Sequence, residues 1–121
     1  MPTSEIPGVN MNVRHELYSG YADIFLFALE SFVANSPASL DALRNVTNEN
    51  LPRYAIDVHA LKSMAAAIGA DELRERARKL EDMAKDGDLQ AVLAENDELF
   101  ERTETLVNNI KNWLDSSDKK N

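Results

Sequence analysis

The 121 residues include 13 Lys and Arg against 21 Asp and Glu, which gives a net charge of −8, and they include no cysteine. The lack of cysteine excludes thiol catalysis, disulfide bonds, thiolate zinc sites and iron–sulfur clusters. The negative charge repels phosphates, so we expect no nucleic-acid partner. No apolar run is long enough to span a membrane, and the first residues lack the pattern of a signal peptide. We therefore expect one cytoplasmic domain without membrane insertion.

The first half of the chain shows the apolar spacing of helices and no alternating strand pattern, which predicts an all-α fold. Ser36 followed by Pro37 suits the N-cap and first position of a helix. A helix break is therefore predicted at Ser36. The elements expected in this half are a flexible lead-in over 1–8, a short amphipathic helix over 9–17, a deeply packed helix over 21–34 and a helix from 36 to about 48.

Glycine and aspartate separate the elements of the second half. Gly69 suits the position after a helix end, and the run Asp86-Gly87-Asp88 suits the end of one helix and the cap of the next. The elements expected here are helices over 50–68, 71–85 and 89–114, then a polar tail over 115–121. Short connections favour antiparallel neighbours. Residues 9–114 are thus predicted to form an antiparallel up-down four-helix bundle with one or two accessory N-terminal helices, and we expect a monomer.

Both histidines lack the surroundings of the common metal and nucleotide sites. Asn12 and Ile56 stand three residues before His15 and His59, so the Glu-x-x-His signature of di-iron bundles is absent. The sequence also has neither a His-Glu-x-x-His zinc motif nor a glycine-rich phosphate loop. We therefore expect no cofactor or metal on this chain and no nucleotide-dependent kinase activity of its own.

His59 is predicted to face away from the core. At about 100° per residue, the apolar set of its helix lies between about 180° and 260° from His59. The side chains on the side of His59 are small, apart from Ile56 and one lysine, Lys62. A positive charge at this spacing can reach an anion held on the imidazole, and small side chains let another protein approach.

The residues around His59 match a known pattern. It consists of His59-Ala60-Leu61-Lys62-Ser63, then Gly69-Ala70, then Leu73, Ala77 and Leu80-Glu81. This pattern resembles the signature of the histidine phosphotransfer (HPt) domain family, found in bacterial hybrid sensor kinases and phosphorelays. The resemblance continues into the segments before and after it and covers nearly the whole chain.

The resemblance implies a function in two-component signalling. His59 would exchange a phosphoryl group with an aspartate of a response-regulator receiver domain, through its Nε2 atom, and Lys62 would stabilise the phosphoryl oxygens. The expected partners are such a receiver or a hybrid sensor kinase, and Mg²⁺ is expected on the receiver. The docking face would consist of Ala55, Ile56, Ser63 and Ala66.

Ser63 departs from the family pattern, which usually has glycine four residues after the histidine. Serine is the next smallest polar residue, and its hydroxyl has two available partners, the phosphate and the carbonyl of His59. Two alternatives therefore stay open. One is a degenerate bundle that binds a receiver without phosphotransfer, and the other is a purely structural bundle in which His59 has no role.

Overall fold

The computed structural model describes the backbone of residues 5–119 and the side chains of residues 5–116. This part of the chain is helical and contains no strand, as the sequence predicts. Its helices are α1 (Val13–Tyr18), α2 (Ala22–Ala42), α3 (Leu51–Ala67), α4 (Asp71–Lys85) and α5 (Leu89–Lys119). Within the described residues, none of the helices is both long enough and apolar enough to cross a membrane.

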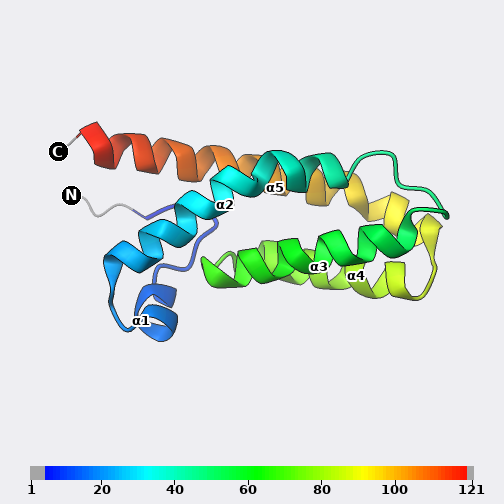
Figure 1. Cartoon of the computed structure of the whole chain (residues 1–121), viewed down its shortest axis with the longest axis horizontal. Helices are drawn as coiled ribbons and strands as arrows, with labels where there is room; N and C mark the ends of the chain where they lie inside the picture. Colours follow the sequence, from blue (N-terminus) through cyan, green and yellow to red (C-terminus); the bar gives the residue numbers. More distant parts are fainter. Residues whose placement is uncertain (1–4, 120–121) are drawn as a thin grey trace.

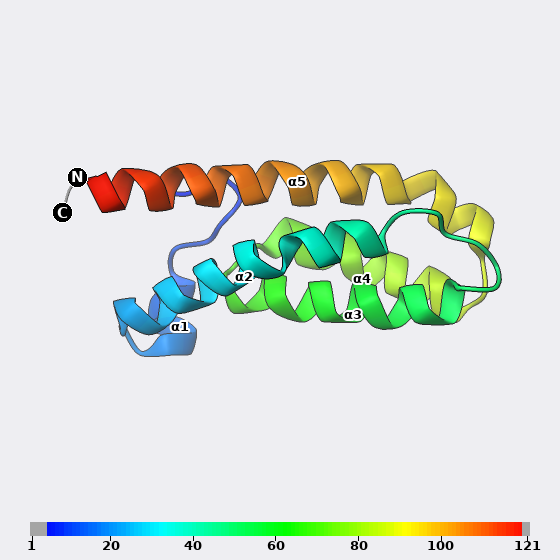
Figure 2. The ribbon, with the colours of Figure 1, turned by 45° about the horizontal axis from the view of Figure 1, so that its top comes forward.

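Helices α2 to α5 form an antiparallel bundle in which each helix runs back along the one before it (Figure 1). α3 packs against α2 and α4. α5 packs against α4 and α2, so each of the four helices contacts two others around the core. α1 lies beside the start of α2 (Figure 2). The hydroxyl of Tyr18 joins α1 to α3 by donating to the carbonyl of Ala67 at 2.8 Å. The predicted bundle with one accessory N-terminal helix is confirmed.

The most extensive contact between two helices joins α3 and α4. Small buried side chains occur on both helices, Ala65 on α3 and Ala77 on α4, and each is 0% exposed. Larger side chains, such as Val58 and Leu61 on α3, fill the interior beside them and are at most 1% exposed. Full burial of a side chain of that size stabilises the fold by about 1.5–3 kcal/mol. The close packing fixes the position of α4 relative to the outer side of α3.

The helix break predicted at Ser36 is wrong, because α2 continues through Pro37 to Ala42. Pro37 has no N–H group to donate to the carbonyl of Val33, four residues earlier. The hydroxyl of Ser36 donates to that carbonyl instead, at 2.7 Å, and Ser36 is buried. The serine that suggested a helix start therefore repairs the hydrogen bond that proline removes. The helix also ends earlier than the predicted residue 48.

The N-terminal part of α2 is less buried than predicted. Phe25, Leu29 and Phe32 are at most 3% exposed, but Tyr21 and Ile24 are 61% and 47% exposed. An apolar stripe wider than the contact surface of the neighbouring helices leaves its edge in solvent. The expectation of a deeply packed helix over 21–34 therefore holds for one face only.

The turn between α3 and α4 requires glycine. Gly69 has φ +76°, and a Cβ atom there would lie 2.6 Å from the carbonyl oxygen of Asn10. The N–H group of Asn10 donates to the carbonyl of Gly69 at 2.7 Å. Gly69 therefore both ends α3 and admits the N-terminal segment against the bundle.

Both ends of the bundle differ from the boundaries expected at residues 9 and 114. Ile6 belongs to the core at 1% exposure, and the carbonyl of Pro7 accepts a hydrogen bond from Asn109 at 3.2 Å. Residues 6–8 thus pack on the bundle, and residues 1–4 of the expected flexible lead-in lie outside the described part. At the other end, α5 continues past Leu114 to Lys119, and residues 120–121 of the expected tail also lie outside the described part.

Candidate functional site

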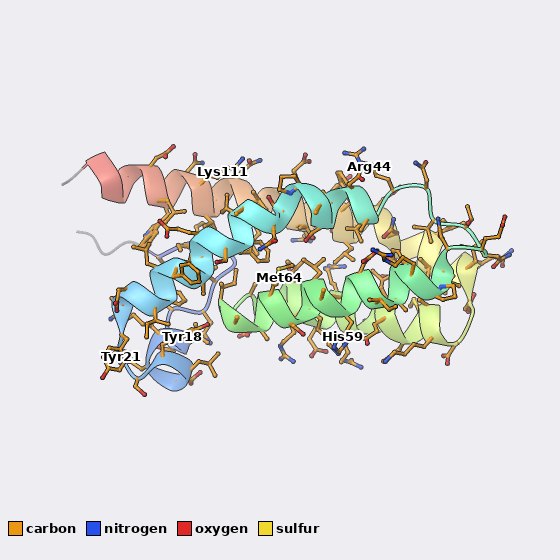
Figure 3. All side chains as sticks on the ribbon, viewed as in Figure 1. Tyr18, Tyr21, Arg44, His59, Met64 and Lys111 are labelled. Carbon is orange, nitrogen blue, oxygen red and sulfur yellow. The ribbon has the colours of Figure 1, made fainter. Side chains whose placement is uncertain are left out.

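His59 lies on the side of α3 that is turned away from the core. Its side chain is 58% exposed, whereas the preceding Val58 is completely buried. Figure 3 shows His59 projecting from the opposite side of α3 to Met64, which lies toward α2. The imidazole is therefore reachable from solvent, as the helical wheel predicts.

A buried carboxylate of α4 holds the His59 ring. The Oε2 atom of Glu81 lies 2.8 Å from His59 Nδ1, and the Glu81 side chain is only 3% exposed. The two residues are 22 positions apart and belong to different helices. Sequence alone presented Glu81 only as part of the Leu80-Glu81 motif and gave it no role. The sequence did contain one indication of a role for Glu81, because a charged residue stands there at a core-facing position of α4, next to Leu80.

Two lysines share the Glu81 carboxylate with His59. Lys62 Nζ of α3 lies 2.7 Å from Oε1, and Lys85 Nζ of α4 lies 2.9 Å from Oε2. The Lys62 side chain is 26% exposed and that of Lys85 is 63% exposed. We call His59, Lys62, Glu81 and Lys85 the Glu81 cluster. Lys62 thus lies next to His59 as predicted, but paired with a carboxylate that the sequence had not placed there.

The Glu81 carboxylate is ionised. Burial alone would raise the pKa of Glu81, but hydrogen bonds from Lys62, Lys85 and His59 outweigh burial and lower the pKa from 4.5 to about 2. In return, the hydrogen bond to Glu81 raises the pKa of Lys85. The carboxylate and the Lys85 ammonium group therefore both keep their charges at neutral pH.

The ionised carboxylate determines which nitrogen of His59 carries the proton. A carboxylate can only accept hydrogen bonds, so His59 Nδ1 must donate at the 2.8 Å contact. In the neutral ring the lone pair then belongs to Nε2. The arrangement therefore leaves the nitrogen with the lone pair, Nε2, on a side chain that is 58% exposed. This is the nitrogen that the family resemblance implied.

Comparison with known proteins identifies the family of this chain. The family model of the Hpt domain matches residues 28–113. The chain belongs to the Hpt domain family. Hpt domains carry out histidine phosphotransfer in phosphorelays, and they interact with response-regulator receivers. The matched range contains α3, α4 and the whole Glu81 cluster. Neither the comparison with curated proteins nor that with solved structures gave a match.

The four predicted docking residues of the Hpt domain differ in exposure. Ile56 is 65% exposed, Ser63 is exposed and Ala66 is half-buried. Ala55 is 8% exposed and belongs to the core, so the expectation that it lies on the accessible face is wrong. Ala55 lies about 40° from His59 on the side where Lys62 also lies, whereas Ser63 lies about 40° to the other side. α4 covers the side of Ala55, and the side of Ser63 stays open.

An apolar groove between α2 and α3 was not predicted. It is lined by Tyr18, Ile24, Phe27, Ala28, Ser31, Phe32, Asn35, Met64 and Ala67. Phe27 is 68% exposed at this groove. On α3, Ala67 lies about 80° and Met64 about 140° from His59, on the same side as Ser63. The open side of His59 therefore continues around α3 into this groove.

Metal-ligating side chains do not gather in the described part of the Hpt domain. Within residues 5–116, no group of three or more His, Asp or Glu side chains is arranged to hold a metal ion. The charged groups nearest to His59 are instead one carboxylate and two ammonium groups. The local chemistry suits the binding of an anion on the ring.

Proposed function

We propose that this Hpt domain accepts a phosphoryl group on His59 Nε2 from an aspartyl phosphate of a response-regulator receiver domain and returns it to an aspartate of the same kind. The observation that carries the proposal is the contact between His59 Nδ1 and the buried, ionised Glu81. This contact orients an exposed ring and leaves the lone pair on Nε2. In a purely structural bundle, an exposed histidine would need no contact with a buried carboxylate of a second helix.

The transfer step needs no general base on this chain. The Nε2 lone pair attacks phosphorus, and the N–P bond forms while the bond between phosphorus and the aspartyl oxygen breaks. The bonding electrons leave with the aspartate carboxylate. The proton stays on Nδ1, so the first product is a positively charged phosphoimidazole ring that Glu81 stabilises. Positioning and charge stabilisation supply most of the catalysis in such a transfer.

Lys62 is the residue of this chain that stabilises the phosphoryl oxygens in the proposal. It lies one helical turn after His59, and its contact with Glu81 Oε1 holds its ammonium group beside the ring. The partial exposure of Lys62, 26%, leaves it accessible to a phosphoryl group on the surface. Mg²⁺ and the acidic pocket around the aspartate would belong to the receiver.

The docking surface in the proposal is the open side of His59. It comprises Ile56 and Ser63 and extends to Phe27 and Met64 at the groove between α2 and α3. Ala66, which is half-buried and lies about 20° from His59 toward the side of Ala55, forms its edge. A receiver must touch this surface directly, because its phosphorus atom has to come within bonding distance of Nε2. Its acidic pocket would face the Lys62 and Lys85 ammonium groups, and apolar side chains around the pocket would cover Ile56 and Phe27.

The test is single-turnover transfer from a phosphorylated receiver, with acid-labile and base-stable phosphate on this chain as the readout. His59→Gln should abolish phosphate uptake and leave receiver binding and thermal stability nearly unchanged, because the side chain is exposed. His15→Gln, which changes the other histidine, is the control and should transfer normally. Ser63→Leu should prevent binding by filling the open side of His59, with the fold intact.

The outcomes separate the proposal from its alternatives. Binding of the receiver without phosphate on the unmodified chain would indicate a degenerate docking domain. The absence of both binding and transfer with a set of receivers would indicate a structural bundle. Normal phosphate uptake by His59→Gln would place the acceptor elsewhere.

A further inference from the structure

The hydroxyl of Ser63 is available to a group from outside the protein. Its side chain is exposed, and it forms no hydrogen bond with any group in the described part of the chain. Two buried hydroxyls within helices differ, because Ser36 donates to the carbonyl of Val33 and Thr103 to that of Leu99, both at 2.7 Å. Ser63 makes no such bond to its own helix. Of the two partners open to this hydroxyl, the carbonyl of the preceding turn is therefore not the one used.

Ser63 lies on the opposite side of His59 from Lys62. On the helical wheel of α3, Ser63 lies about 40° to one side of His59, and Lys62 lies about 60° to the other side. Both residues come one helical turn after His59, at the spacings that make residues neighbours on a helix surface. A group held on the imidazole would therefore have a hydroxyl on one side and an ammonium group on the other.

The contact with Glu81 directs a group on Nε2 toward the side of Ser63. Glu81 belongs to α4, and its carboxylate meets His59 Nδ1 at 2.8 Å. The bonds that leave the two nitrogens of an imidazole ring diverge widely, so a group on Nε2 extends away from Glu81. α4 covers the far side of the ring, and the side of Ser63 stays open.

Hydrogen-bond donors are scarce on this open side of α3. The side chains within about 90° of His59 in that direction are those of Pro52, Ile56, Ser63 and Ala67. Only the serine among these four has a polar side chain. A phosphoryl group that extends to the open side of the ring would thus meet one α3 side chain there that can donate to it.

A phosphoryl group can use this donor in addition to Lys62. Its oxygens carry negative charge, and a hydrogen bond to an ionised acceptor is stronger than one between neutral groups. Glycine, the usual residue of the family pattern at this position, has no side-chain donor. Serine adds a donor with only a small increase in size, so the position still admits a partner.

We propose that the Ser63 hydroxyl donates a hydrogen bond to the phosphoryl group on His59 Nε2, on the side opposite Lys62. Ser63 is then a phosphoryl-binding residue that stabilises the phosphorylated form of this chain. The hydroxyl keeps its proton and exchanges a hydrogen bond with water for one with a phosphoryl oxygen, so the covalent step stays as described above. The inference rests on the proposed function for the identity of the acceptor nitrogen.

The test is the equilibrium distribution of phosphate between the full chain and a receiver. At concentrations too low for complexes to accumulate, this distribution depends only on the free phosphorylated and unphosphorylated proteins, so a change in docking affinity does not alter it. Ser63→Ala removes only the hydroxyl. It should shift the distribution toward the receiver by about 3- to 10-fold, which is the effect of losing one hydrogen bond at an exposed site.

Three further variants make the result specific. Ser63→Thr keeps the hydroxyl and should leave the distribution close to that of the unmodified protein. Ser63→Gly should shift the distribution as Ser63→Ala does, although glycine and alanine differ widely in helix propensity. Ser39→Ala removes a hydroxyl of α2 outside the docking surface and should leave the distribution unchanged.

An unchanged distribution in Ser63→Ala would overturn the inference. Slower transfer by Ser63→Ala with the same distribution would also overturn it, because Ser63 would then act in docking alone. Equal shifts in Ser63→Ala and Ser63→Thr would show that the hydroxyl is not the group that matters.

Phosphoramidate, a small phosphoryl donor, separates this inference from the proposed function. Its P–N bond breaks as the bond between phosphorus and the imidazole nitrogen forms, and ammonia leaves. At equilibrium with phosphoramidate and ammonia, Ser63→Ala should be less phosphorylated by the same factor of about 3 to 10. This shift in a chain that accepts nothing from receivers supports the Ser63 contact and contradicts the proposed function. No shift in a chain that exchanges phosphate with receivers overturns the contact alone, and a chain that accepts phosphate from neither donor overturns both.

Discussion

Among the polar contacts that join helices in the described part of the bundle, those at Glu81 and at Asn96 have different surroundings. Asn96 of α5 accepts from the Tyr54 hydroxyl at 2.7 Å and donates to the carbonyl of Leu43 at 2.7 Å. Burial raises the pKa of Tyr54, so its hydroxyl remains a donor. This network is neutral, and Asn96 and Tyr54 are at most 7% exposed.

The Glu81 cluster instead joins a buried anion to exposed groups. Glu81 is 3% exposed, but the His59 and Lys85 side chains are 58% and 63% exposed. The Asn96 network has its hydrogen-bonding groups turned inward, whereas the cluster leaves Nε2 available to a partner. Buried polar groups whose partners are also buried join the helices, whereas the buried Glu81 also fixes groups that solvent and other molecules can reach.

The largest expected effect is on stability at the neutral network. Asn96→Ala removes the partner of both the Tyr54 hydroxyl and the Leu43 carbonyl, and buried groups left without partners cost about 3 kcal/mol together. Urea unfolding should show this loss, while the transfer rate of the folded protein stays unchanged. Asn108→Ala, at an exposed position of α5, is the control and should change the stability by less than about 0.5 kcal/mol. Reduced transfer by folded Asn96→Ala would show that the Asn96 network also supports phosphotransfer, contrary to this expectation.

At the Glu81 cluster, we expect a change in the transfer rate. Glu81→Gln keeps the shape but lets the amide either donate to or accept from His59 Nδ1, so the proton is no longer fixed there. The single-turnover transfer rate should fall about 10- to 100-fold, which is the cost of losing the carboxylate that orients a histidine in metal sites. Glu75→Gln, which changes an exposed carboxylate of α4, should transfer normally. An unchanged rate in Glu81→Gln would show that Glu81 does not orient the ring.

The smallest expected effect is a dependence of stability on pH that the Glu81 cluster has and the neutral Asn96 network lacks. The pKa of Glu81 is about 2 in the folded protein and 4.5 unperturbed, so its stabilisation is fully present above about pH 4.5 and is lost as the pH falls toward 2. The full shift corresponds to about 3 kcal/mol, and screening at the exposed His59 and Lys85 reduces it to about 1–2 kcal/mol.

Urea unfolding at pH 7 and pH 3 measures this dependence. The stability difference between the unmodified protein and Glu81→Gln should be about 1 kcal/mol smaller at pH 3 than at pH 7. The difference between the unmodified protein and Asn96→Ala should be the same at both values, because that network is neutral. A difference for Glu81→Gln that stays constant would mean that the cations do not stabilise the carboxylate.

Sequence predicted the helices well where single residues have one strong conformational effect. Gly69 ends α3, and Gly87, with φ +75°, separates α4 from α5 as predicted. Pro37 led to the wrong prediction of a helix break. Its effect depends on its neighbour, Ser36, because the Ser36 hydroxyl supplies the donor that proline lacks. The effect of proline on a helix therefore cannot be predicted from the proline alone.

The site was predictable only where it depends on local sequence. The exposure of His59 follows from the period of one helix, which is local information. The burial of Ala55 does not, because it depends on where α4 lies against α3. Likewise, Ile24 and Phe27 have the spacing or character of core residues, yet they are exposed because no neighbouring helix covers that edge of α2.

By itself, the sequence determined that this protein is an all-α bundle that carries an exposed histidine on α3 with a lysine one turn later. These properties follow from periodicity, turn residues and spacing within one helix. Only the tertiary structure decided that Glu81 of α4 meets His59, that Nε2 carries the lone pair of the neutral ring, and that the open side of His59 continues into the groove with α2. Such contacts depend on how helices pack against one another, and a carboxylate 22 positions away becomes a partner of the ring only after the core between α3 and α4 has formed.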